Sequence, residues 1–303
     1  MPKGADAVVI QENCDYDSDN VSVLRSVTEG ANVRPKGQDI VAGASVVGAG
    51  KKLNAIDISL LASIGVAEVE VYRPLKVALF STGDELVEPG QKLKVGQIFN
   101  SNRPLLMALC EKMGVRSYDC GIVEDTLEAT MLALTEAAKT ADLIISSGGV
   151  SVGEEDHVKP AVEALGDLAM WKVQIKPGKP VAFGNVAGVP FLGLPGNPVS
   201  SFTVFQLLGA PIIDSLGGRQ ITEPLNYSVI SEFSKPISSR EEYIRVKLRS
   251  DINGDKYADR FANLSSGVMS SLSWADGLVR QEIDSAIEVG QRLTFYPLRD
   301  AML

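Results

Sequence analysis

Residues 143–153 read Leu143-Ile144-Ile145-Ser146-Ser147-Gly148-Gly149-Val150-Ser151-Val152-Gly153. The apolar run at the start indicates a strand that is buried on both faces, as strands of parallel sheets are. The serine and glycine residues after it have little side-chain bulk, so backbone amides in this loop can approach a ligand closely. A buried strand that opens directly into such a loop is typical of α/β proteins, which bind ligands at this end of their strands.

The same pattern of strand and loop occurs on both sides of this stretch. The other three units are Lys76–Phe80 with 81–85, Met170–Ile175 with Lys176-Pro177-Gly178-Lys179-Pro180, and Phe191–Leu194 with Pro195-Gly196-Asn197-Pro198. Apolar residues at helical spacing predict helices over about 101–113, after Asp125 and after Asn197. Asp125 and Glu128 are expected to form a capping box for the second of these helices. We therefore predict an α/β domain with a mostly parallel sheet over residues 74–217.

The segment before this domain is expected to be a small β-rich piece, spanning residues 1–73, with a linking helix. Its short β-type runs are Ala7–Gln11, Val21–Val27 and Ile40–Val47, and Asn54 is placed to cap the helix.

The segment after the domain, residues 218–303, is predicted to be a C-terminal β-barrel or sandwich. Between Tyr243 and Arg249, apolar and polar residues alternate, which is the pattern of a strand with one face in a core.

The composition of the 303 residues excludes several classes of protein. With 45% hydrophobic and 22% charged residues, the chain is an ordinary globular protein. A net charge of −9 argues against nucleic acid or an anionic membrane as partner. An odd number of cysteines, no evident apolar stretch of membrane-spanning length and no secretory segment predict a cytoplasmic protein without a membrane partner. The single histidine, His157, leaves carboxylates, lysines, backbone amides or a metal ion for any catalysis.

Three kinds of loop residue are candidates for that chemistry. The loop from Ser147 to Gly153 either contacts an anion or nucleotide or is a tight turn, and its residues alone favour neither. Lys176 and Lys179 lie three residues apart, and we interpret them as a site for a dianion instead of ordinary surface lysines. Asp156 and Glu85 are candidate ligands for Mg²⁺, although most loop carboxylates are helix caps or solvated charges.

Four motifs occur in an order and spacing that resemble one protein family. They are Thr82-Gly83-Asp84-Glu85-Leu86, Ser147-Gly148-Gly149-Val150-Ser151-Val152-Gly153 with Asp156, Lys176-Pro177-Gly178-Lys179-Pro180, and Gly193-Leu194-Pro195-Gly196-Asn197-Pro198-Val199-Ser200. This set resembles the molybdopterin molybdenumtransferases of the MoeA/gephyrin type. The resemblance implies a molybdopterin-binding α/β domain, a C-terminal β-barrel and a homodimer. It also implies transfer of molybdate onto the dithiolene of adenylylated molybdopterin, with Mg²⁺-dependent release of AMP and molybdenum cofactor.

The resemblance also implies roles for individual residues. Those expected to contact the adenylylated pterin are Ser147, Gly148, Gly149, Val150 and Ser151. Those associated with molybdate are Lys176, Lys179, Pro180 and Ser200, with Arg245 and Ser266 as looser matches and the loop residues Pro195, Gly196 and Asn197 as further binding candidates. Asp156 is expected to help bind Mg²⁺, while Asp142 and Glu85 match acidic positions that serve the nucleotide or the metal.

The N-terminus of the chain departs from the family pattern. Family members continue on the N-terminal side with a helical segment, a Ser-Ala-Met-Asp-Gly-Tyr motif and a Thr-Gly-Ala-Pro stretch, and residues 2–9 match the segment that comes next in those proteins. We therefore expect Met1 to be an internal start. We also expect the chain to bind molybdate or the nucleotide pterin but to turn over poorly.

Three alternatives stay open on these residues. Molybdopterin adenylyltransferase resembles residues 75–217, but it normally lacks the C-terminal β-domain and the paired-lysine loop; it is also an expected partner. A second alternative is a scaffold that anchors receptor peptides, as gephyrin-type relatives do. The third is a truncated homologue that binds its ligands without catalysis.

Overall fold

The computed structural model describes residues 1–150 and 156–298 of the chain. The chain divides into two compact units, Met1–Val69 and Glu70–Leu303. The α/β part and the barrel described below both belong to the second unit.

The first unit contains little regular structure. Its elements are the 3₁₀ helix η1 (Gln11–Asn13), strands β1 (Cys14–Tyr16) and β2 (Val21–Val23), which pair as an antiparallel hairpin, and helix α1 (Ala55–Ser63). The prediction of strands at Ala7–Gln11 and Ile40–Val47 was wrong, because these runs have no paired neighbour and no covered apolar face to hold them extended. The helix begins as predicted, since the Asn54 side chain accepts hydrogen bonds from the backbone N–H groups of Ile56 and Asp57.

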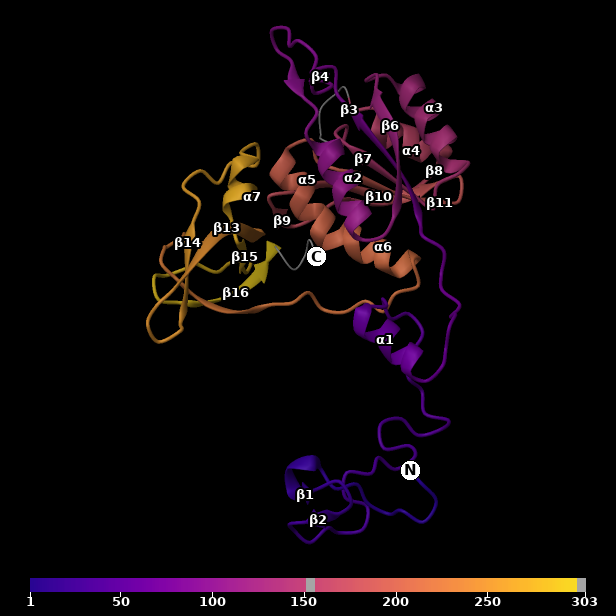
Figure 1. The fold of residues 1–303 in the computed structure, drawn as a ribbon. Coiled ribbons are helices and arrows are strands. Elements are labelled where there is room, and N and C mark those ends of the chain that lie inside the picture. Colours follow the sequence, from indigo (N-terminus) through magenta and orange to yellow (C-terminus); the bar gives the residue numbers. More distant parts are fainter. Residues whose placement is uncertain (151–155, 299–303) are drawn as a thin grey trace. The chain divides into compact units, whose positions relative to one another are not determined.

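A six-stranded sheet lies at the centre of the second unit (Figure 1). Its strands, in spatial order, are β6 (Arg116–Val123), β3 (Lys76–Thr82), β7 (Leu143–Ser147), β11 (Val189–Leu194), β10 (Pro180–Val186) and β8 (Gly166–Lys172). The first four strands run parallel, and β10 pairs antiparallel with both of its neighbours, β11 and β8. The predicted α/β class with a mostly parallel sheet is therefore confirmed, and β7 is buried along its whole length as its apolar run indicated.

The strand expected near Met170–Ile175 is divided between two sheets. Strand β8 ends at Lys172 and lies at the sheet edge, where most of its residues are partly or fully exposed. Strand β9 (Ile175–Lys176) instead pairs with the barrel. The lysine loop therefore does not follow a buried central strand.

Helices cover both faces of the sheet (Figure 1). Helix α2 (Asn102–Lys112), helix α5 (Pro198–Val204), the π-helical turn η2 (Phe205–Gly209) and helix α6 (Ala210–Leu216) pack on one face; α3 (Leu127–Ala138) and α4 (Val158–Leu165) pack on the other. Strand β3 serves both cores, because Val77 and Leu79 point to the first face and Ala78 and Phe80 to the second.

The cap of α3 differs from the prediction. Thr126, not Asp125, is the capping residue, and its hydroxyl accepts a hydrogen bond of 3.2 Å from the backbone N–H of Ala129. The prediction of a capping box at Asp125 and Glu128 was therefore wrong by one residue, because the helix begins one position later than expected.

The stretch Pro198–Leu216 is, by length and composition alone, able to cross a membrane, contrary to the expectation of no such stretch. Half of it is buried inside the protein, and Phe202, Phe205 and Ile213 belong to the core under the sheet. This burial is the arrangement of a core helix.

The last part of the second unit is a five-stranded barrel, which confirms the predicted C-terminal β-barrel. Its strands are β12 (Tyr227–Ser231), β13 (Glu241–Ser250), β14 (Lys256–Arg260), β15 (Gly277–Gln281) and β16 (Arg292–Pro297), with a short helix, α7 (Ser270–Trp274), before β15. Pairing of β13 with β14 closes the order β14-β12-β16-β15-β13. On the face of β13 predicted to be polar, Arg245 is buried, because the chain beyond β14 covers it.

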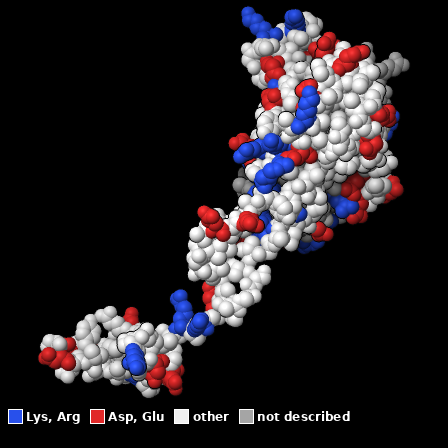
Figure 2. Space-filling view, turned by 90° about the vertical axis from the view of Figure 1, so that its right-hand side faces the viewer, with Lys and Arg blue, Asp and Glu red and all other residues white. Residues whose placement is uncertain are grey.

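Charged side chains are intermixed on the surface. On the face of the second unit that Figure 2 shows, Lys and Arg alternate with Asp and Glu without separating into large areas of one sign. The acidic surplus of the sequence is therefore not gathered into one patch on this face.

Candidate functional site

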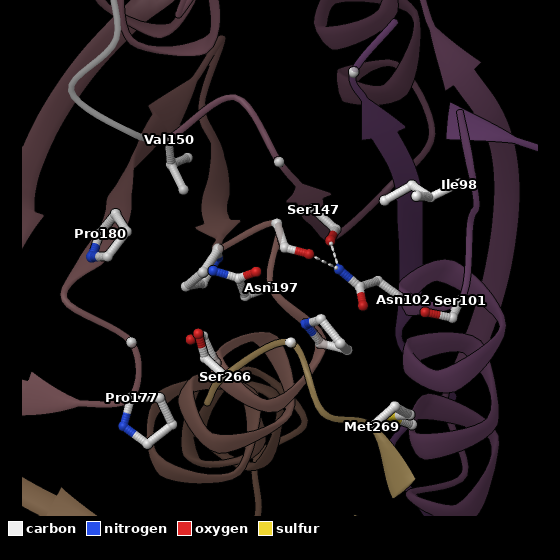
Figure 3. A pocket seen from close by; sticks show the side chains of 18 of the residues that line it. Ile98, Ser101, Asn102, Ser147, Val150, Pro177, Pro180, Asn197, Ser266 and Met269 are labelled. Atoms are coloured by element: carbon white, nitrogen blue, oxygen red, sulfur yellow. Dashed lines mark hydrogen bonds between the residues drawn. The ribbon is translucent and has the colours of Figure 1, made fainter. Parts of the chain in front are cut away.

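A cavity of about 950 Å³ opens at the carboxyl ends of β3, β7 and β11. Its size is that of a site for a drug-sized or larger small molecule. In Figure 3, Pro177 and Pro180 lie on one side and Ser147, Asn102 and Ile98 on the other, while Ser266 and Met269 come from the chain of the barrel. The α/β part and the barrel thus build this cavity together.

Most of the residues predicted as site residues meet in this cavity. They are Glu85, Ser147, Gly148, Gly149, Val150, Lys176, Lys179, Pro180, Pro195, Gly196, Asn197, Ser200 and Ser266. Asp142, Asp156 and Arg245 do not line it, and Ser151 lies outside the described residues.

The glycines after β7 are required by close packing against the end of β3. Gly148 and Gly149 have φ values of +96° and +64°. A Cβ atom on Gly148 would lie 2.4 Å from the Thr82 carbonyl oxygen, and one on Gly149 would lie 2.5 Å from Val158. Only glycine fits both positions, so the backbone of this loop forms the cavity wall without side chains.

One amide side chain joins this loop to the loop after β11. The Asn102 Nδ2 group, at the start of α2, donates to the Ser147 hydroxyl at 2.8 Å and to the Gly196 carbonyl at 2.7 Å (Figure 3). Because a carbonyl only accepts, the Asn102 nitrogen must face Gly196. Its oxygen then faces away, and it is buried without a hydrogen-bond partner among the described residues.

The lysine loop is held between α5 and the barrel. Gly178 has a φ of +123°, and a Cβ atom there would lie 2.4 Å from the Val204 side chain. The Lys176 ammonium lies 3.2 Å from a carboxylate oxygen of Glu242 on β13. Within the described part of the chain, Lys179 has no carboxylate at ion-pair distance.

The loop that carries Ser266 reaches across from the barrel. The backbone N–H of Val199, next to Ser200 in the first turn of α5, donates to the Ser266 carbonyl at 3.0 Å. Arg245 holds this loop from behind, because its guanidinium donates to Ser271 Oγ and to the carbonyls of Asn263 and Ser265. Burial lowers the pKa of Arg245. Arg245 was predicted to contact the ligand directly, but in the structure it lies behind the Ser266 loop and does not line the cavity.

Glu85 is the one predicted acidic residue that lines the cavity. It lies between β3 and strand β4 (Leu86–Val87), which pairs with β5 (Ile98–Phe99) to form a two-stranded flap beside the cavity. Asp142 lies at the opposite end of β7, where its two carboxylate oxygens accept hydrogen bonds from Arg73 at 2.6 and 2.7 Å. Hydrogen bonding to Arg73 lowers the pKa of Asp142, and the structure does not bring this residue to the cavity.

Asp156 is a buried carboxylate that lies close to the charge of Asp125. Its two oxygens are buried, and neither accepts a well-formed hydrogen bond among the described residues. Burial raises the pKa of Asp156 to about 6, the nearby N–H of Val158 offsets part of this effect, and the charge of Asp125 adds to it. Asp125 itself lines the cavity.

These carboxylates could hold Mg²⁺ only together with oxygen atoms of water or of a bound substrate. In residues 1–150 and 156–298, no group of three or more His, Cys, Asp or Glu side chains is placed to hold a metal ion. Mg²⁺ usually binds through one or two carboxylates together with water and substrate phosphates, so this acidic edge remains compatible with it.

Several cavity residues were not found by sequence reasoning. They are Thr82, Asn100, Ser101, Asn102, Asp125, Arg240, Glu242 and Ser265. The polar run Asn100-Ser101-Asn102 directly after the short strand β5 was a usable signal, since it follows the same strand-then-loop rule. Arg240 and Glu242 had no such signal, because only the pairing of β9 with β13 brings them to the lysine loop.

Comparison with known proteins agrees with this architecture. Residues 78–215 match the family described as a probable molybdopterin binding domain, residues 1–65 the MoeA N-terminal region (domain I and II), and residues 234–298 the MoeA C-terminal region (domain IV).

Two curated relatives and one solved structure are similar over most of the chain. The molybdopterin molybdenumtransferase of Haemophilus influenzae is 42% identical over 76% of this chain and 58% of the relative. A putative molybdopterin biosynthesis protein of Methanocaldococcus jannaschii is 32% identical over 99% of this chain and 74% of the relative. The crystal structure of the molybdopterin biosynthesis protein moeA of Pyrococcus horikoshii has a TM-score of 0.81 and 30% identity, covering 98% of this chain and 73% of that one.

The chain spans somewhat more than half the length of the Haemophilus relative. It nevertheless matches all three regions in their order, and it covers about three quarters of the Methanocaldococcus and Pyrococcus proteins. On these grounds, the chain belongs to the MoeA family of molybdopterin biosynthesis proteins.

Proposed function

We propose that this chain inserts molybdate into adenylylated molybdopterin, with release of AMP and molybdenum cofactor. The observation that carries the proposal is the single cavity that joins the glycine loop after β7 to the lysine loop before β10. A nucleotide-bearing pterin and a dianion need these two surfaces side by side. The name of the Haemophilus relative, a molybdopterin molybdenumtransferase, supports the same reaction.

The lysine side of the cavity is the proposed molybdate subsite. Lys179 and Lys176 supply positive charge, and the hydroxyls of Ser200 and Ser266 supply hydrogen-bond donors for the oxygens of the anion. Two unit charges about 4 Å apart attract by about 4 kcal/mol at an effective dielectric constant of about 20, before desolvation is subtracted. The glycine at 178 lets the backbone carry both lysines past the Val204 side chain.

The glycine side of the cavity is the proposed subsite for the adenylylated pterin. Backbone groups of Gly148, Gly149 and Val150 face this space with little side-chain bulk, and Pro195, Gly196 and Asn197 continue the wall. Asn102 holds the two loops together, so it fixes the spacing between the two halves of the wall.

Asp156, with Asp125 and Glu85 nearer the cavity, would hold Mg²⁺ in this proposal. When bound, Mg²⁺ would neutralise phosphate oxygens of the nucleotide. Asp156 itself supplies buried carboxylate oxygens, and a hard cation binds to such oxygens. A homodimer and direct delivery of the substrate by the adenylyltransferase are further parts of the proposal, and they rest on family resemblance. A cytoplasmic location is also part of the proposal, and it rests on the odd number of cysteines.

The test is calorimetric titration of molybdate into the parent chain and the variants Lys179→Ala, Lys176→Ala and Lys139→Ala, followed by measurement of AMP release from adenylylated molybdopterin. Loss of one charge-assisted contact is expected to weaken molybdate binding of Lys179→Ala by about tenfold or more. Lys139→Ala is the control, because Lys139 is exposed at the end of α3 and pairs with Glu136. Unchanged affinity in both Lys179→Ala and Lys176→Ala contradicts the molybdate subsite. If the parent chain binds molybdate but releases no AMP, the chain is a binding protein and the proposed transferase activity is wrong.

A further inference from the structure

The two-stranded flap beside the cavity has an apolar face. In the parallel pairing of β4 with β5, Leu86 lies opposite Ile98 and Val87 lies opposite Phe99. Since side chains alternate between the two faces of a strand, Leu86 and Ile98 project together from one face. Both line the cavity. On the other face Val87 is buried, and Phe99 also lines the cavity where β5 ends.

Ile98 is an apolar side chain that the protein itself leaves uncovered. It is 55% exposed, and in Figure 3 it extends from the flap toward the side of the cavity where Ser147 lies. A single exposed apolar residue on a protein surface is ordinary. Ile98 differs because it adjoins Leu86 in the wall of a cavity, where a ligand can remove both side chains from water.

A buried arginine holds the base of this flap. The side chain of Arg103, on α2, is only 8% exposed, and its Nη2 group donates to both carboxylate oxygens of Glu88 at 2.6 and 2.7 Å. Glu88 directly follows β4. The Nε group of Arg103 lies 2.7 Å from a carboxylate oxygen of Asp119 on β6. Because the flap is anchored before any ligand binds, little ordering of this wall is needed on binding.

The order of groups around the cavity indicates which part of the ligand meets the flap. The lysine loop, with the proposed molybdate subsite, lies on one side of the cavity and Ile98 on the other (Figure 3). Glu85, beside the proposed magnesium and phosphate position, directly precedes Leu86. In adenylylated molybdopterin, the dithiolene that receives molybdate and the adenine lie on opposite sides of the phosphates. With the dithiolene toward the lysines, the adenine lies toward the flap.

We propose that Ile98 and Leu86 form an apolar platform for the adenine ring of the adenylylated pterin. The inference rests on the proposed function and adds a surface for the base to it. A flat aromatic ring offers its whole face to such a platform, and covering the two side chains removes apolar surface from water. Ile98 is therefore expected to make affinity depend on the base of the nucleotide.

The experiment compares AMP with ribose 5-phosphate, which keeps the sugar and the phosphate but lacks the base. Both are titrated calorimetrically, with Mg²⁺ present, into the parent chain, Ile98→Ala, Ile98→Leu and Val95→Ala. Val95 is the matched control, because it is a fully exposed apolar residue in the loop between β4 and β5 and does not line the cavity.

Ile98→Ala is expected to weaken AMP binding by about fivefold or more and to leave ribose 5-phosphate binding unchanged. Ile98→Leu should restore most of the affinity for AMP, since it keeps the apolar volume. Val95→Ala should bind both probes as the parent does. Thermal unfolding and the affinity for molybdate, which should equal those of the parent, show that each variant is folded.

The possible results separate the platform from the proposed function. Parent-like AMP binding by Ile98→Ala, while Lys179→Ala still weakens molybdate binding, overturns the platform alone. Equal loss of AMP and ribose 5-phosphate affinity also overturns it, because the base is then not what Ile98 contacts. The same holds if Ile98→Ala weakens binding of 6-hydroxymethylpterin but not of AMP, or if the parent binds molybdate but not AMP. A parent chain that binds neither molybdate nor AMP contradicts both proposals.

Discussion

Asp156 is a carboxylate whose surroundings disfavour its charged form. Burial raises the pKa of Asp156 from 3.8 to about 6, and the charge of Asp125 acts in the same direction. The folded protein therefore binds a proton at Asp156 more tightly than the unfolded chain does. Ionisation of Asp156 therefore lowers the stability of the folded protein. This loss of stability is absent below about pH 4, grows as pH rises to about 6, and persists above that value.

Replacing this carboxylate should stabilise the protein in a pH-dependent way. In EDTA, Asp156→Asn is expected to have a higher Tm than the parent at pH 8 and the same Tm at pH 4, because only the charged form is penalised. Added Mg²⁺ with AMP should raise the Tm of the parent more than that of Asp156→Asn. Differential scanning calorimetry at both pH values measures this, with Glu163→Gln, on the exposed face of α4, as the control. A lower Tm of Asp156→Asn at pH 8 would show that the carboxylate is already compensated.

Two arginines of the barrel show that residue type alone does not tell which side chain faces the cavity. Arg240 and Arg245 occur five positions apart in one stretch of sequence, and the family resemblance pointed to Arg245. Burial and hydrogen bonding separate them, because Arg245 supports the Ser266 loop while Arg240 lines the cavity.

At the scale of elements, the glycine loop after β7 depends on the close approach of two backbone segments. The serine and glycine composition predicted either backbone amides that approach a ligand or a tight turn. In the structure, the glycines pack closely against Thr82 and Val158. Positive φ values occur elsewhere in the chain without any such contact. Gly188, in the hairpin between β10 and β11, has a φ of +87°, and no atom lies within 4 Å of the place that a Cβ would occupy there.

Gly149→Ala and Gly188→Ala separate backbone strain from close packing. Gly188→Ala is expected to cost about 1–2 kcal/mol of unfolding free energy, because alanine must adopt a left-handed conformation. Gly149→Ala should cost about 1–3 kcal/mol more, since its Cβ also overlaps Val158 and Thr82. Urea unfolding measures both values, and titration of AMP should show weaker binding only for Gly149→Ala. Equal destabilisation of the two variants would mean that the loop shifts freely and does not form a fixed wall.

The position of the lysine loop at the cavity was predicted, but the burial of the strand before it was not predicted correctly. Both lysines line the cavity, but the strand before them was expected to be buried. Strand β8 is an edge strand, and β9 pairs with the barrel, because the chain leaves the sheet after Lys172.

At the scale of the whole molecule, the second unit holds its cavity without any core residue from the first. All three hydrophobic cores of the described structure use residues from Leu75 onward. The core under α2 and α5 also contains Tyr243, Leu272 and Leu278 of the barrel part. The α/β part and the barrel are therefore expected to unfold together.

A fragment of residues 70–303 should fold and bind molybdate with the affinity of the full chain. The shorter fragment 70–217 is the comparison, because it removes the barrel residues from the shared core and should lose cooperative unfolding. Thermal unfolding and calorimetric titration of both fragments measure this. An unfolded 70–303 fragment would show that the first unit contributes to the stability of the second.

Some properties of this protein were determined by the sequence alone. Buried parallel strands, the Asn54 cap, the glycine loop and the barrel strand at Tyr243–Arg249 follow from local patterns of apolar residues and turn residues. Such patterns act over a few neighbouring residues, so they can be recognised without knowing the fold. Strand β2 lies within the predicted run Val21–Val27, but its partner β1 escaped this reasoning, because an exposed strand depends on its partner more than on its own pattern.

Only the tertiary structure decided which charged groups face the cavity. Asp142 lies at the wrong end of β7, Arg245 is buried behind a loop, and Arg240 reaches the lysine loop through the pairing of β9 with β13. The physical reason is that a charge acts through space on whatever the fold brings near it. Arg240 and Ile175, 65 positions apart in sequence, become neighbours only when β9 pairs with β13.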